Sequence, residues 1–165
     1  MRWPVAAIPL LAVLVAAVLP SCSGSQSRGS VPSDGTEWPQ NYTSWKRLNE
    51  APILLESEKT ARNILVNQVV LSHRKDGSAA YPIGAVLVKE EMHLESDPQG
   101  RLRPGEVFRV SVMFKVGRGD TSGWAFKAFD PKTKREFPRD RVDPDGCYFC
   151  HADAKAGDYV FSRVD

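Results

Sequence analysis

Two cysteines and a histidine near the end of the 165-residue chain form the group best suited to chemistry. They lie in the stretch CYFCHADAKAGDYVF, residues 147–161, where Cys147, Cys150 and His151 make a Cys-x-x-Cys-His motif. The chain has three cysteines in all, and the third is Cys22. Structural zinc sites, redox disulfides and covalent haem attachment all use a close cysteine pair. Other features of the sequence have to separate these three alternatives.

The surroundings of the motif favour haem. A zinc site needs a second group of ligands, and the remaining histidines, His73 and His93, lie far from the cysteines in sequence and from each other. A thioredoxin-like redox pair belongs to a βαβ unit, which the strand pattern below does not indicate. Haem attachment needs two thiols three residues apart and a histidine directly after them, beneath the iron. The motif therefore predicts haem c with iron bound by His151, and it leaves zinc and a disulfide as alternatives.

The N-terminus indicates export. Residues 5–19, VAAIPLLAVLVAAVL, form an apolar run that is too short for a stable membrane span and is typical of a secretory signal. The following LPSC, which ends at Cys22, is similar to a bacterial lipoprotein signal, although ordinary cleavage nearby is the alternative. We predict a signal peptide over residues 1–21 and a periplasmic protein whose membrane contact is a lipid on Cys22. Export agrees with haem c, because that haem is attached outside the bacterial cytoplasm.

Composition limits the remaining chain to one domain. Residues 23–36, SGSQSRGSVPSDGT, are rich in Gly and Ser and lack an apolar period, so we predict a flexible tether over residues 22–37. The rest, residues 38–165, is long enough for a single domain with a core. The net charge is +2, without a long run of either sign, and nothing therefore indicates a nucleic-acid partner.

The periodicity of the domain predicts mostly strands. Apolar residues alternate or are β-branched in segments that are separated by short turns containing Gly, Pro and Asp. We predict one short helix over residues 41–50 and strands over residues 64–72, 84–94, 106–116 and 123–129. Strands without long intervening helices favour an antiparallel sheet, so the expected class is mainly β (α+β), with a few short helices in a single domain.

The alternation also assigns faces to the two central strands. In residues 84–94, the residues expected on the core face are Val86, Val88, Met92 and Leu94. Lys89 points the opposite way, with Ala85 and Leu87. In residues 106–116, the residues expected on the core face are Phe108, Val110, Val112, Phe114 and Val116. Its other face carries Arg109, Ser111, Met113 and Lys115.

Several of these stretches together resemble the cytochrome P460 family, which is related to cytochrome c′-beta. The resemblance rests on GAVLVKEE, GWAFKAFD, CYFCHADAKAGDYVFS and NYTSWKRL, and it covers most of residues 38–163. It implies a dimeric, largely antiparallel fold with a five-coordinate haem, a histidine ligand and an open distal side. In the best-known members, a lysine in a segment like VLVKE is joined covalently to the porphyrin, and the matching residue is Lys89.

The distal side decides what such a haem does. Composition alone offers Met92, Met113, His73 and His93 as sixth ligands. We expect Met92 in the core, the two histidines exposed near strand ends, and Met113 bordering the haem. Family members that oxidise hydroxylamine carry a distal carboxylate, and the resemblance places Ser111 there. A serine is not a base at neutral pH, which puts that reaction in doubt.

Two functional classes follow. The first is a haem oxidoreductase that acts on hydroxylamine or nitric oxide, with Lys89 as the catalytic side chain and a periplasmic electron acceptor of unknown identity. The second is a cytochrome without turnover, which binds gases or transfers electrons. In both classes the cofactor is covalent haem c with its iron, and the protein is a homodimer.

Overall fold

The computed structural model describes residues 37–76, 80–117 and 123–162. The predicted signal peptide, Cys22 and all but the last residue of the predicted tether lie outside these ranges. Among the described residues, no helix is both long enough and apolar enough to cross a membrane.

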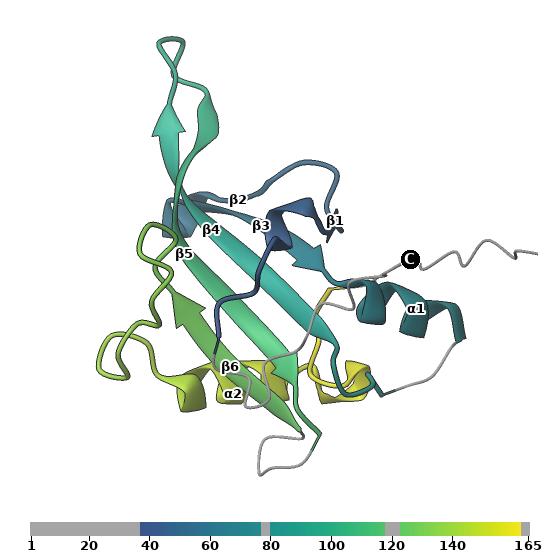
Figure 1. Ribbon diagram of the computed structural model, residues 1–165. Helices are drawn as coiled ribbons and strands as arrows, with labels where there is room; N and C mark the ends of the chain where they lie inside the picture. Colours follow the sequence, from purple (N-terminus) through teal and green to yellow (C-terminus); the bar gives the residue numbers. More distant parts are fainter. Residues whose placement is uncertain (1–36, 77–79, 118–122, 163–165) are drawn as a thin grey trace, which may run out of the picture.

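One antiparallel sheet forms the body of the molecule (Figure 1). Its strands run in the order β1-β3-β4-β5-β6, and β2 also pairs with β3. Their bounds are β1 Lys46–Arg47, β2 Ile53–Leu55, β3 Thr60–Val66, β4 Val86–Ser96, β5 Leu102–Lys115 and β6 Trp124–Phe129. The helices are α1 Gln68–Asp76 and α2 Pro144–Ala152, with short 3-10 turns η1 Tyr42–Ser44, η2 Glu56–Glu58 and η3 Lys155–Gly157. The predicted mainly β class is confirmed.

The β4–β5 hairpin is the longest feature of the sheet and extends beyond the other strands at one end (Figure 1). An irregularity in the pairing separates Glu91↔Arg109 from Met92↔Val107, so Phe108 has no partner in the register. Val107 therefore packs against the core, while the Phe108 ring stacks on His93 at 4.3 Å. The assignment of Phe108 to the core face is wrong, because strict alternation does not anticipate a bulge.

The predicted helix over residues 41–50 is also wrong. Asn41 adopts a left-handed conformation, with φ 55°, and makes no side-chain cap, so only the turn η1 follows it. The next residues, Lys46 and Arg47, pair with Val66 and Leu65 of β3. Pairing with the sheet has overridden the local helical spacing.

The predicted strand over residues 64–72 divides at Asn67. The Asn67 carboxamide donates to the Gly84 carbonyl at 2.8 Å and accepts from the backbone N–H groups of Val70 and Val86, both at 3.2 Å. Acceptance from Val70 is an N-cap interaction, and α1 starts at the next residue. The β-branched residues of the stretch are thus shared between β3 and α1.

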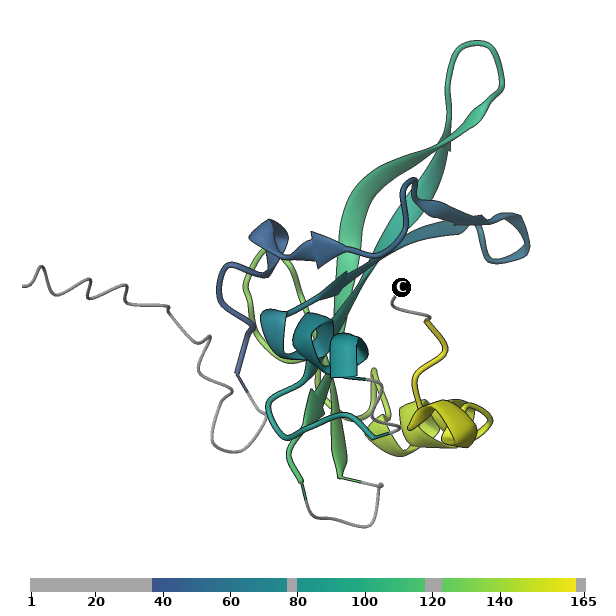
Figure 2. The same cartoon turned by 90° about the vertical axis from the view of Figure 1, so that its right-hand side faces the viewer.

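The sheet separates two apolar clusters. One contains Val86, Val88, Val110, Val112 and Phe114 and is covered by Trp38, Tyr42 and Trp45 of the N-terminal segment. The other contains Leu87, Met113, Trp124, Phe126 and Tyr159 and is packed against α2. Figure 2 shows the N-terminal segment and α2 on opposite sides of the sheet.

Candidate functional site

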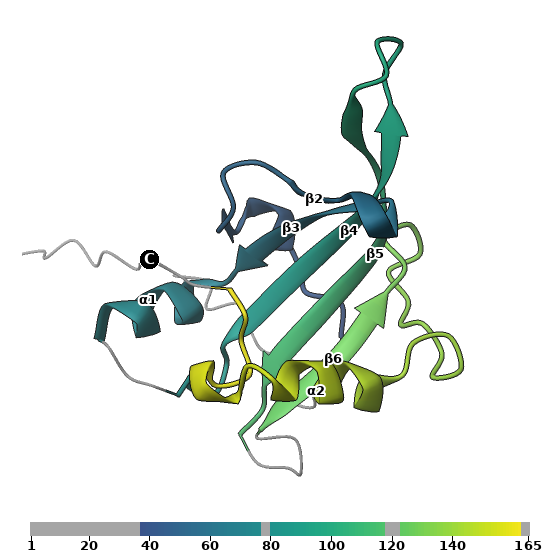
Figure 3. The same cartoon turned by 180° about the vertical axis from the view of Figure 1, so that it is seen from behind.

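The helix α2 carries the Cys-x-x-Cys-His motif across one face of the sheet (Figure 3). Asp143 starts the helix, because its carboxylate accepts from the N–H groups of Asp145 and Gly146, and Pro144 fits the first turn. Cys147 and Cys150 are one helical turn apart and therefore share a face. Both are free thiols, with Cys147 half-buried and Cys150 exposed. Burial raises the pKa of the Cys147 thiol.

His151 is held in one orientation by its neighbours. Its Nδ1 lies 2.7 Å from the carbonyl oxygen of Tyr159, so this nitrogen must donate, because a carbonyl only accepts. The ring also lies between Phe126 and Phe161, with centroid distances of 5.2 and 5.1 Å. Burial lowers the pKa of His151, which keeps the imidazole neutral at pH 7. The remaining nitrogen, Nε2, therefore has a free lone pair, as in a metal-ligating histidine.

Asp158 fixes the segment that orients His151. Its carboxylate accepts from Lys115 Nζ at 2.9 Å and from the backbone N–H of Tyr81 at 2.7 Å. Its carbonyl accepts from Trp124 Nε1 at 2.9 Å. Asp158 and Tyr159 both have positive φ, 53° and 66°, so the chain turns sharply here and brings the Tyr159 carbonyl to His151. Tyr159 also stacks on Tyr148 of α2 at 5.8 Å.

A cavity of about 630 Å³ lies beside α2 and is bounded by the sheet and the C-terminal segment. This volume is within the range of small-molecule and cofactor sites. The predicted site residues that line it are Cys147, Cys150, His151, Lys89, Ser111 and Met113. Residues that are far apart in sequence thus meet at one space.

The sheet wall of this cavity changes from apolar to charged along the strands. In antiparallel pairs, residues directly opposite each other share a face. One row contains Leu87, Met113 and Phe126, and the next contains Ile64, Lys89 and Ser111. A third row contains Arg62, Glu91 and Arg109. A flat, largely apolar ligand would therefore contact hydrocarbon near α2 and polar groups farther along.

Glu91 is the centre of the charged row, and its role was not predicted from the sequence. Arg109 binds both carboxylate oxygens, through Nε at 2.5 Å and Nη2 at 2.6 Å. Ser111 Oγ donates at 2.9 Å, and Lys89 Nζ lies 3.3 Å away. Burial alone would raise the pKa of Glu91, but hydrogen bonds from Arg109 and the charge of Lys89 hold it below its usual value. Glu91 is only 8% exposed and ionised, so it organises three cavity residues.

The other candidate ligands do not line this cavity. Met92 is buried in the core, as predicted. His93 is exposed, also as predicted, whereas His73 is buried beside Tyr81, with a centroid distance of 4.7 Å. The prediction that His73 is exposed is wrong because residues 68–76 form a helix rather than a strand end. Among the described residues, no group of three or more His, Cys, Asp and Glu could hold a metal ion, which gives the zinc alternative no support.

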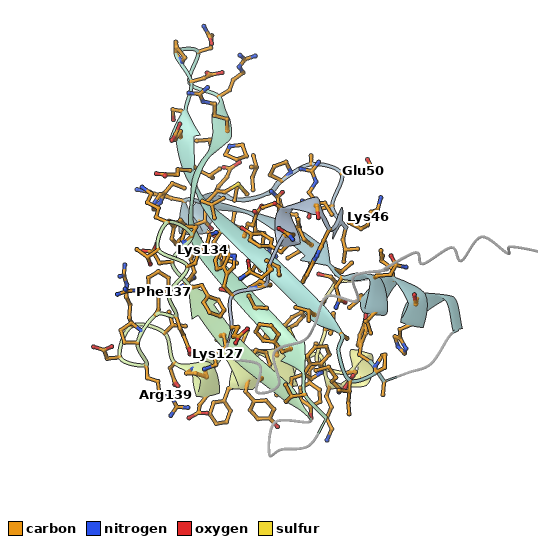
Figure 4. The ribbon with its side chains drawn as sticks, in the orientation of Figure 1. Lys46, Glu50, Lys127, Lys134, Phe137 and Arg139 are labelled. Atoms are coloured by element: carbon orange, nitrogen blue, oxygen red, sulfur yellow. The ribbon has the colours of Figure 1, made fainter. Side chains whose placement is uncertain are left out.

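Lys127, which also borders the cavity, belongs to the opposite side of β6. It pairs with Val112 in the register and forms an ion pair with Glu136 at 2.7 Å. Figure 4 shows it on the side of the sheet that faces away from α2, near Lys134, Phe137 and Arg139 of the following loop. Its charge is therefore not available to a ligand beside α2.

Comparison with known proteins gives one result. The family model described as Cytochrome P460 matches residues 39–162, which includes every residue that the site is built from. No curated protein matches the chain.

Proposed function

The chain belongs to the cytochrome P460 family of c-type haem proteins, and on this basis we propose that α2 holds one covalent haem. Cys147 and Cys150 would hold it, each through a C–S bond to one vinyl group of the porphyrin. The thiol hydrogen would go to the other vinyl carbon, so no oxidant is needed. His151 would bind the iron through Nε2.

The observation that carries this proposal is the hydrogen bond from His151 Nδ1 to the Tyr159 carbonyl. It leaves Nε2 as the free nitrogen and fixes the plane of the ring, and metal-bound histidines are typically held in this way. The fit extends beyond this residue. The cysteines lie on the same helix at the wall of a 630 Å³ cavity, and the apolar row Leu87, Met113 and Phe126 faces that cavity.

We propose that His151 would be the only side chain to bind the iron, and that Met113 would border the haem without binding it. Among the described residues that line the cavity, His151 is the only histidine. Across the cavity, the sheet presents Lys89, Ser111 and Met113. Bound haem supplies redox chemistry and a coordination position for a small ligand. We propose oxidoreductase activity on hydroxylamine or nitric oxide, in which Lys89 contacts the porphyrin edge and changes its electronics.

One observation favours the alternative of a gas-binding or electron-transfer cytochrome without turnover. Oxidation of hydroxylamine needs a group that accepts protons. Glu91 is the nearest carboxylate to Ser111, yet Arg109 and Lys89 keep it ionised with a lowered pKa. A carboxylate that is held in this way accepts a proton poorly, so turnover has to use another acceptor or does not occur.

The location and assembly belong to the same proposal. We propose a periplasmic protein, tethered by lipid on Cys22, that works as a homodimer and exchanges electrons with a periplasmic partner. The export signal in the sequence supports the location, and the family resemblance supports the dimer. Mass spectrometry of the native N-terminus tests the lipid, and an unmodified terminus downstream of Cys22 would contradict it.

Acid–acetone extraction tests the haem proposal. The protein is produced in a periplasm that has a haem c maturation system, denatured and extracted. The haem should stay with the polypeptide, and the Cys147→Ser, Cys150→Ser double variant should lose it. Extractable haem in the wild-type protein would contradict the proposal. Turnover with hydroxylamine then separates the oxidoreductase from the non-catalytic cytochrome.

A further inference from the structure

The hydroxyl group of Ser111 has a fixed direction. The Glu91 carboxylate accepts a hydrogen bond from this hydroxyl at 2.9 Å. The same carboxylate accepts two hydrogen bonds from Arg109 and forms an ion pair with Lys89. A carboxylate has about four lone-pair positions that can accept hydrogen bonds, and these four contacts occupy all of them. An ionised carboxylate cannot donate, and the hydrogen between the two groups therefore belongs to Ser111.

This direction determines whether Ser111 can donate or accept a hydrogen bond in the cavity. A serine oxygen has one hydrogen and two lone pairs. The hydrogen is used by Glu91, while Ser111 itself lines the cavity. Only lone pairs remain for a molecule in the cavity. We propose that Ser111 acts as a hydrogen-bond acceptor there and makes the site prefer small ligands that donate a hydrogen bond, such as hydroxylamine, over ligands that only accept, such as nitric oxide.

Lys89 supplies the complementary polarity. It lies directly opposite Ser111 in the β4–β5 register, and its ammonium has three hydrogens, of which Glu91 engages one side. As long as this ammonium is not bonded to the porphyrin, a donor and an acceptor thus face the cavity from neighbouring strands. Hydroxylamine carries N–H and O–H donors together with an oxygen acceptor and can use both groups. The inference rests on the proposed haem, which would place the ligand within reach of this pair.

Carbon monoxide on the reduced, haem-loaded protein reports the sign of this polarity. A lone pair that faces the ligand makes the local potential negative, disfavours electron donation from iron into CO and raises the C–O stretching frequency. A hydroxyl hydrogen that faces the ligand has the opposite effect. We therefore expect Ser111→Ala to lower the C–O stretch relative to wild type. Ser96→Ala, at the exposed end of β4, is the matched control and should leave the stretch unchanged.

A second variant reverses the direction without removing the hydroxyl. In Glu91→Gln, the amide can donate to Ser111 Oγ, which releases the hydroxyl hydrogen towards the cavity. The C–O stretch should then fall below that of Ser111→Ala. Affinities give an independent readout: Ser111→Ala should weaken hydroxylamine binding by about 2- to 10-fold, the range for one net hydrogen bond, and leave nitric oxide binding unchanged.

The outcomes separate this inference from the haem proposal. A C–O stretch that rises or stays constant in Ser111→Ala would overturn the acceptor assignment while the CO spectrum itself still demonstrates haem. Equal loss of affinity for hydroxylamine and nitric oxide would also overturn it. If acid–acetone extraction shows covalent haem but neither wild type nor variant forms a CO complex, a side chain occupies the sixth position, and this inference fails while the haem proposal stands. If the extraction shows no covalent haem, both fail.

Discussion

The two faces of the sheet are buried by different means. On one face, Val88, Val110 and Phe114 are fully buried, and the N-terminal segment covers them with Trp38, Tyr42 and Trp45. On the other face, the same strands present Leu87, Lys89 and Glu91, and α2 lies beyond a cavity of about 630 Å³. The first face is a closed hydrocarbon core, whereas the second combines an apolar cluster with a cavity that charged and polar side chains line.

This difference indicates which face contributes more to the stability of the fold and which face forms the haem site. Close packing gives the first face a large contribution to folding through apolar burial. The cavity face also buries an apolar cluster, but part of that face borders the cavity, and polar anchors help to hold it, namely the Lys115–Asp158 ion pair and the contacts of Glu91. Variants of the closed face should therefore change stability alone, and variants of the cavity face should change stability less but alter the haem.

The largest loss of stability is expected on the closed face. Phe114 is 0% exposed, so Phe114→Ala leaves a cavity that its neighbours cannot fill. The free energy of unfolding should fall by about 4 kcal/mol. Met113→Ala, the adjacent residue on the other face, should cost less because Met113 lines the cavity and is 8% exposed, so it is not enclosed on all sides by the core. Urea unfolding of both variants measures this, and equal losses would show that the two faces are packed alike.

Asp158→Asn should have the next largest effect. It removes the ion pair of Lys115, whose side chain is 9% exposed, and retains a residue that tolerates positive φ. We expect a loss of about 3 kcal/mol, because the buried ammonium loses its ionised carboxylate. Because Tyr159 follows Asp158, the absorption spectrum of the haem should also change. Asp153→Asn, exposed at the end of α2, is the control, and the account fails if both variants behave alike.

Glu91→Gln should give a smaller loss that depends on pH. At neutral pH, the variant leaves Arg109 and Lys89 without an ionised partner and should cost about 1–2 kcal/mol, since Arg109 is partly exposed. The folded pKa of Glu91 is lowered, so its stabilisation is complete above the unfolded value of about 4.3 and is lost as pH falls through the folded value. The difference between wild type and variant should therefore shrink below about pH 4. Urea unfolding of both proteins at pH values above and below about 4 measures this difference. A difference in the free energy of unfolding that does not change with pH would contradict the ionised state assigned to Glu91.

Lys89→Ala should have the smallest effect on stability and a clear effect on the haem. The side chain is 37% exposed, so loss of its ion pair should cost only a few tenths of a kcal/mol. If Lys89 is bonded to the porphyrin, wild type and variant should differ in their spectra after denaturation in pyridine. Identical c-type spectra would mean that no crosslink exists. Unchanged ligand binding as well would show that Lys89 is an ordinary surface residue.

Local patterns explain what the sequence could predict. The Cys-x-x-Cys-His motif is contiguous, and the alternation in residues 110–114 depends only on a period of two, so both could be read without knowing the fold. The same two-residue period predicts that Lys89 and Met113 lie on the sheet face opposite the closed core. The stretch 64–72 was misread because β-branched residues favour strands, while the cap that starts α1 depends on Asn67 contacting Gly84 across the fold.

The polar anchors could not be predicted because they depend on the register of distant residues. Glu91 meets Arg109 and Ser111 only when β4 and β5 pair as observed, with the irregularity after Glu91. Asp158 meets Lys115 and Tyr81, which are 43 and 77 positions away in the chain. The available signal was weak, because β4 and β5 carry several other charged residues, and nothing in the sequence distinguishes Glu91 and Arg109 as the pair that meets at the cavity.

The central claim is that α2 carries covalent haem through Cys147 and Cys150, and peptide mass spectrometry tests it most directly. Trypsin cleaves after Arg141 and Lys155 and releases residues 142–155, VDPDGCYFCHADAK, which contain the whole motif. For the protein purified from the periplasm, denatured and treated with a thiol-alkylating reagent, we predict this peptide with the added mass of one haem and no alkylation. The peptide without haem, alkylated at both cysteines, would contradict the account.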